Sequence, residues 1–154
     1  MISNGQNEKE YDLLIRGGHV YNGLGTPGQD VDVAVKGGRI VHLGPGLEGR
    51  HAGRVIDASG LVVAPGFIDP HSHTDVELLV NPRAESKIRQ GVTTEIGGNC
   101  GFTFFPLNDE SFQQRGRILK EKYDLDLDWR DIRGFFRRLE QGGIALNYAT
   151  LLGH

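Results

Sequence analysis

Hydrophobic and polar positions in the first part of the chain alternate over short runs separated by glycine. Residues 31–35, Val-Asp-Val-Ala-Val, alternate with period two, and residues 40–43, Ile-Val-His-Leu, follow the turn sequence Lys-Gly-Gly-Arg. Two such runs joined by a few turn residues are typical of a β-hairpin. We therefore predict a small antiparallel β unit over residues 11–64, after a polar tail at residues 1–10. Further short runs belong to the same pattern, at residues 13–15, 55–57 and 61–63.

After Pro65 the pattern changes to strands that alternate with helices, so residues 65–154 are predicted to form a different domain. A parallel sheet is expected here, either doubly wound or closed into a barrel. The predicted strands are residues 66–69, 92–96 and 144–152. The predicted helices are residues 82–90, capped by Asn81, residues 111–122, and residues 128–141, capped by Asp128.

Composition and charge exclude several classes of protein. The chain has 154 residues, of which 38% are hydrophobic and 24% charged, as in ordinary globular proteins, so a disordered tail, a collagen-like repeat and a coiled coil are disfavoured. A net charge of −3 gives no sign of a nucleic-acid or anionic-membrane partner. One cysteine cannot form an internal disulfide. The 23 glycines indicate many turns.

The amino terminus lacks the features of a targeting segment. Residues 1–10 are polar and have neither an apolar core nor a small-residue cleavage site, so no signal peptide is predicted. Nowhere does the chain offer about 18 consecutive apolar residues, the length that a membrane span requires. The expected location is the cytoplasm.

Two histidines follow the predicted strand at residues 66–69. His71 and His73 are two positions apart, so on an extended chain their side chains project to the same side. Two neutral imidazoles on one side form half of a metal site, and barrel strands carry functional groups at this end. Asp69 and Asp75 flank the pair. The alternative interpretation is two solvated loop histidines.

Cys100 follows the next predicted strand and lies among the glycines of residues 97–101. A thiolate beside two imidazoles suits zinc, which accepts sulfur and nitrogen ligands together. Two other interpretations stay open: a small buried hydrophobic residue, or a nucleophile with His71 or His73 as its base. His154 follows the third strand and is a candidate third imidazole ligand, a substrate contact or a structural histidine.

These residues carry a family resemblance. Residues 63–73, Val-Ala-Pro-Gly-Phe-Ile-Asp-Pro-His-Ser-His, resemble the first-strand signature of the amidohydrolase superfamily. Residues 90–94, Gln-Gly-Val-Thr-Thr, and residues 98–101, Gly-Asn-Cys-Gly, resemble its N-acyl-D-amino-acid deacylase branch, the D-aminoacylases. Asn147 and the closing Leu-Gly-His at residues 152–154 match the same branch. The first motif is specific only for the superfamily, whereas Gly-Asn-Cys-Gly is more selective.

The resemblance implies an α/β fold, a metal-dependent (β/α)₈ TIM barrel with a small β-sandwich built partly from the amino-terminal segment. It implies that His71 and His73 bind zinc and that Cys100 supplies a thiolate able to bridge two metal positions, with one or two ions bound. The metal would polarise the amide carbonyl of a small-molecule N-acyl-D-amino acid and lower the pKa of a bound water. Candidates for substrate contacts or for support around the metal are Asp75, Asn99 and His154.

The length of the second part limits what the chain is expected to contain. A (β/α)₈ barrel takes about 250 residues, whereas residues 65–154 number 90. We therefore expect the first three barrel units only, and the chain is interpreted as an amino-terminal part of a deacylase that is inactive alone. The resemblance places the catalytic aspartate and the remaining histidine ligands beyond residue 154, so no catalytic residue is assigned.

Two alternative functions are compatible with this part of the sequence. A cyclic amidohydrolase of the hydantoinase or dihydroorotase kind would keep the barrel and the metal. Those relatives typically bridge their metals with a carboxylated lysine, and residues 97–101 contain no lysine. A non-catalytic zinc-binding module would use the same three ligands, although complete structural zinc sites take four.

Overall fold

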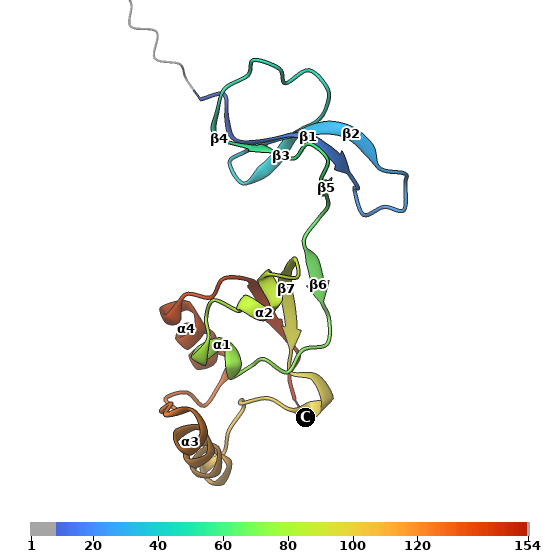
Figure 1. Cartoon of the computed structure of the whole chain (residues 1–154). Helices are drawn as coiled ribbons and strands as arrows, with labels where there is room; N and C mark the ends of the chain where they lie inside the picture. The colour runs from blue at the N-terminus through green and yellow to red at the C-terminus, as the bar shows by residue number, and fades with distance from the viewer. Residues whose placement is uncertain (1–8, 154) are drawn as a thin grey trace, which may run out of the picture. The chain divides into compact units, whose positions relative to one another are not determined.

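The structure is a computed structural model that describes residues 9–153 and divides into two compact units, Met1–Pro65 and Gly66–His154 (Figure 1). Each unit is described by itself. Within the described residues, every helix is too short or too polar to cross a membrane.

The first unit is a five-stranded sheet built around its longest strand, β1 (Tyr11–Val20). β1 pairs antiparallel with β2 (Gln29–Lys36), and β2 pairs antiparallel with β3 (Arg39–Gly44), which confirms the predicted hairpins. β4 (Ala52–Asp57) and β5 (Val62–Val63) instead run parallel to β1. The prediction of an antiparallel unit throughout is therefore wrong for these two strands.

Hydrogen bonds between β1 and the residues that link β4 to β5 explain this difference. Ala58 N donates to Arg16 O over 2.7 Å, and His19 N donates to Leu61 O over 2.9 Å. The chain therefore does not fold back at Ser59-Gly60 but continues in the same direction along β1. β1 also runs through its own glycine pair, where a register shift lies between Ile15 and Gly18.

The second unit contains three parallel strands in the order β6 (Phe67–Asp69), β7 (Val92–Gly97) and β8 (Asn147–Thr150). The predicted parallel sheet is confirmed for these three strands, whereas the closed barrel and the β-sandwich stay predictions. Its helical segments are α1 (Glu77–Val80), α2 (Glu85–Ile88), the 3₁₀ turn η1 (Asn99–Gly101), α3 (Asp109–Tyr123) and α4 (Ile132–Gly142).

The helix predicted over residues 82–90 is confirmed only in part, because just Glu85–Ile88 (α2) is helical and the predicted start after Asn81 is wrong. Asn81 ends α1 instead of capping a helix, and α2 begins only after Ala84, whose φ is 45°. Pro82 O accepts a hydrogen bond from Ala145 N over 2.8 Å, so a tertiary contact occupies this carbonyl. The proline at this position therefore separates two short helices.

The other two predicted helices exist with shifted ends. α3 starts after Asn108, whose side chain accepts from Ser111 N over 2.8 Å. α4 starts after Asp131 and not after the predicted cap Asp128, because Asp131 Oδ1 accepts from Gly134 N over 2.7 Å.

The core of the second unit forms where α4 packs against aromatic side chains of the loops. Phe135 and Leu139 of α4 are buried, and α4 also contacts α1. The Phe135 ring lies 5.1 Å from Phe105 and 5.7 Å from Trp129, measured between centroids. Trp129 Nε1 donates to Phe104 O over 3.1 Å, so the indole is buried with its polar atom paired.

Truncating Phe135 should therefore destabilise the second unit. We expect Phe135→Ala to lower the free energy of unfolding by about 3–5 kcal/mol, the usual cost of removing a buried aromatic ring. Urea unfolding followed by the fluorescence of Trp129, the single tryptophan of the chain, measures this loss. Ile132→Ala, at a 40% exposed position of the same helix, is the control and should cost far less. Equal losses would contradict this packing.

Candidate metal centre

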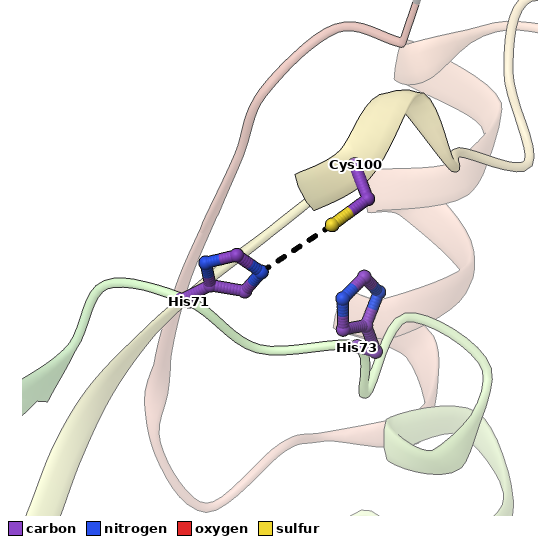
Figure 2. A group of neighbouring side chains, drawn as sticks. All are labelled: His71, His73 and Cys100. Carbon is purple, nitrogen blue, oxygen red and sulfur yellow. Dashed lines mark hydrogen bonds between the residues drawn. The ribbon is translucent and has the colours of Figure 1, made fainter.

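Three side chains from two loops converge in the second unit (Figure 2). His71 and His73 follow β6, and Cys100 lies in η1, directly after β7. One ligand atom from each lies within 4.8 Å of the others, and all three residues are exposed. The imidazole centroids are 5.4 Å apart, and Cys100 Sγ lies 3.5 Å from His71 Nε2. The structure thus brings together the three residues predicted as metal ligands.

The backbone around Cys100 turns sharply to reach the histidines. Cys100 has a φ of 57°, a left-handed conformation that L side chains rarely adopt, between Gly98 at 72° and Gly101 at 69°. A Cβ on Gly98 would overlap Leu151 O, so this glycine is required both for its φ and for its close approach to the chain after β8. The glycines therefore allow the tight turn that presents the thiol.

Asn99 joins the two loops that carry the ligands. Its Nδ2 donates to Ile96 O over 2.7 Å and to Ser72 O over 3.3 Å. Ser72 lies between the two histidines, and Asn99 is buried. The side chain thus bonds the end of β7 to the segment of His71 and His73.

Asp75 is buried behind the cluster and contacts two other elements. Its Oδ1 accepts from Tyr148 Oη over 2.6 Å and from Gly98 N over 3.2 Å. Its Oδ2 is buried and lacks a hydrogen-bond partner among residues 9–153. Burial, followed by the hydrogen bond to Asp75, raises the pKa of Tyr148 well above its ordinary value. Asp75 therefore connects the histidine loop, the cysteine loop and β8.

A cavity of about 180 Å³ adjoins His73 and Asp75. Apolar side chains form much of its wall, among them Phe102, Phe104 and Ile118. The cluster thus has a space beside it in which a small molecule with an apolar part would fit.

The buried Glu95 forms an ion pair with the partly buried Lys87, which the sequence pattern did not predict. The Lys87 ammonium lies 2.9 Å from Glu95 Oε1 and 2.6 Å from Asp69 Oδ2. The hydrogen bond from Lys87 lowers the pKa of Asp69, and hydrogen bonds to Asp69 and then Glu95 raise the pKa of Lys87. Asp69 therefore faces a lysine. The sequence feature that could have indicated this ion pair is the carboxylate of Glu95 within the β-branched strand Val92-Thr93-Thr94-Glu95-Ile96.

The other histidines of the described residues belong to the first unit. His154 is outside the described residues. His19, His42 and His51 belong to the first unit, where His19 Nδ1 is paired with Asp30 Oδ1 over 2.7 Å.

A match to a known protein family covers this site. The model of the amidohydrolase family matches residues 54–133, which include both histidines and the cysteine. The chain belongs to the amidohydrolase family.

Individual relatives agree with this amidohydrolase assignment. A D-aminoacylase from Alcaligenes xylosoxydans xylosoxydans is 46% identical over 152 residues, which cover 96% of this chain and 30% of the relative. A crystal structure of N-acyl-D-glutamate deacylase from Bordetella bronchiseptica, complexed with zinc and a phosphonate inhibitor, is 35% identical with a TM-score of 0.81. The aligned region covers 96% of this chain and 30% of the deacylase chain. A D-aminoacylase structure concerned with a binuclear metal centre has 37% identity and a TM-score of 0.78, covering 94% and 30%.

The chain therefore spans about 30% of the length of the relatives that it matches.

The bond between Tyr148 and Asp75 should make the second unit more stable at neutral than at alkaline pH. Folding favours the protonated phenol, so this contribution is complete below the ordinary tyrosine pKa of about 10 and decreases as the pH rises above it. We expect Tyr148→Phe to be less stable than the unaltered chain by about 1–3 kcal/mol at pH 7, because it removes a hydrogen bond to a buried carboxylate.

Urea unfolding of both proteins at neutral pH and above pH 10 measures this dependence. The difference between them should shrink as the pH rises, because a phenylalanine ring cannot ionise and only the unaltered chain loses stability through this group. A difference that stays constant or widens would show that the phenol is not held protonated by the fold.

Proposed function

We propose that this amidohydrolase chain supplies part of the metal centre of a zinc-dependent enzyme that hydrolyses the amide bond of N-acyl-D-amino acids. The observation that carries the proposal is the convergence of His71, His73 and Cys100, with ligand atoms within 4.8 Å of one another. The identity to a D-aminoacylase and the likeness to a zinc-containing deacylase structure support this substrate class over a cyclic amide.

The chemistry of the donor atoms fits zinc. Two imidazole nitrogens and a thiolate are ligands that this borderline-soft ion accepts together, and three protein ligands leave a position open as in catalytic sites. When bound, zinc acts as a Lewis acid on an amide carbonyl and promotes attack by water at neutral pH. His71, His73 and Cys100 would hold one ion, or two if the thiolate bridges.

Other residues of the chain would shape the site around the substrate. The apolar wall formed by Phe102, Phe104 and Ile118 suits the acyl part of the substrate. Asp69 is paired with Lys87, and Asp75 accepts from Tyr148 through one of its oxygens. We assign the proton-transferring group to neither carboxylate, nor to any other described residue.

The first test is metal binding by the chain itself. We expect the purified 154-residue chain to retain zinc after dialysis. His71→Ala, His73→Ala and Cys100→Ser should each bind it more weakly by more than about 100-fold, beyond the usual effect of changing a residue around the ligands. Elemental analysis and titration against a chromophoric chelator measure content and affinity.

His42→Ala is the matched control, because it removes an imidazole from the first unit. It should bind zinc like the unaltered chain. If all three site variants also kept their zinc, the proposed metal centre would be refuted.

The second test concerns turnover. Because no described residue is assigned as the proton-transferring group, we expect the zinc-loaded 154-residue chain to show no hydrolysis of N-acetyl-D-amino acids in an assay for the released amine. Zinc-dependent release by this chain, lost in Cys100→Ser, would overturn the expectation of inactivity and support the deacylase activity directly.

A further inference from the structure

The two histidines alternate with two hydroxyl residues that face a different environment. His71 and His73 are exposed, whereas Ser72 is buried and Thr74 partly buried. This alternating burial places the imidazoles on the solvent side of the segment and the hydroxyls on its inner side. Whatever holds the hydroxyls therefore also fixes the direction of the imidazoles.

Glu95 of β7 holds both hydroxyls. Thr74 Oγ1 donates to Glu95 Oε2 over 2.6 Å, and Ser72 Oγ donates to Glu95 Oε1 over 3.3 Å. The two hydroxyl oxygens also lie 2.9 Å apart. The backbone adds a further bond, since Ser72 N donates to Ile96 O over 3.1 Å. The histidine segment is thus bonded along the end of β7.

The burial of Glu95 makes these bonds costly to break. Its exposed fraction is 0%, and its charge is compensated by Lys87 of α2, 2.9 Å from Oε1. If a buried carboxylate loses a hydrogen-bond donor, the free-energy cost of removing that carboxylate from water is no longer compensated. Conformations in which the histidine segment leaves Glu95 are therefore disfavoured before any metal binds.

We propose that Glu95 is a positioning residue of the metal centre, which orients His71 and His73 through the hydroxyls of Ser72 and Thr74. The inference rests on the proposed function, since it concerns the same zinc site. Glu95 contacts neither imidazole in this scheme. Its role is to keep the two nitrogens on one side of the chain, so that zinc binding does not have to order the segment.

The carboxylate is required because both of its oxygens accept. Oε1 accepts from Ser72 and Lys87, and Oε2 accepts from Thr74. A glutamine has one acceptor oxygen and an amide group that only donates, so one of the two hydroxyls would have to accept instead of donate, and the ion pair with Lys87 would be lost.

The test compares zinc affinity in a pair of variants at Thr74. Thr74→Val has nearly the same shape but no hydroxyl, and Thr74→Ser keeps the hydroxyl. We expect Thr74→Val to bind zinc about 10-fold more weakly, within the range typical of residues around metal ligands, and Thr74→Ser to bind like the unaltered chain. Substitution of cobalt for zinc adds a spectroscopic measurement. If His71 and His73 are less well oriented, the absorption bands of the bound cobalt should change.

Glu95→Gln tests the carboxylate itself. It should weaken zinc binding by at least as much as Thr74→Val, and the double variant should bind no more weakly than Glu95→Gln alone, because Thr74 acts through Glu95. Effects that multiply in the double variant would overturn the inference. Trp129 fluorescence during urea unfolding shows whether each variant is folded. If Glu95→Gln does not fold, the comparison of Thr74→Val with Thr74→Ser tests the inference instead.

Thr93→Val is the matched control, the same change at an exposed position of β7. It should leave zinc affinity unchanged. If the unaltered chain binds zinc and Thr74→Val binds it equally well, or Thr74→Ser binds as weakly as Thr74→Val, Glu95 does not position the site and the proposed function stands. If the unaltered chain binds no zinc, the proposed function fails and this inference with it.

Discussion

The parallel pairing of β6 with β7 determines where all three candidate ligands lie. Asp69 stands opposite Glu95 in the register, so both strands end at the same edge of the sheet and their following loops meet. The hydrogen bond from Ser72 N to Ile96 O continues this alignment beyond the last paired residues of β6. The histidine segment and the cysteine turn therefore approach each other because of backbone pairing, before any side chain contributes.

Two buried carboxylates then fix these loops from behind. Asp75 accepts from the backbone of Gly98 and from Tyr148, and Glu95 accepts from the hydroxyls beside the histidines. Both are almost fully buried, at 1% and 0% exposure, so each oxygen that loses its donor carries a large free-energy penalty. The loops are thereby restricted to conformations that keep these hydrogen bonds, and the same conformations bring the candidate ligands together.

The sequence was sufficient for features that depend on local pattern. The period-two pattern of an extended chain predicted that His71 and His73 lie on one side. The positions where neighbouring strands end predicted that Cys100 lies near them. Contacts between distant residues were not predictable in this way: Tyr148 lies 73 positions from Asp75, and Ala145 N binds the carbonyl of Pro82 inside a predicted helix. The parallel course of β4 and β5 was missed for the same reason, since β1 and not the local turn decides their direction.

The division between exposed ligands and buried supports bears on metal selectivity. Exposed imidazole and thiol groups bind several divalent metals, and affinity alone follows a fixed order that does not favour zinc over copper. Geometry is the property that a protein can adjust. In the proposed metal centre it would depend on carboxylates that lie behind the candidate ligands, of which Glu95 is paired with Lys87 and Asp75 accepts from the phenol of Tyr148. Because neither is a ligand in this arrangement, substitutions there would change the spacing of the donor atoms without changing their identity.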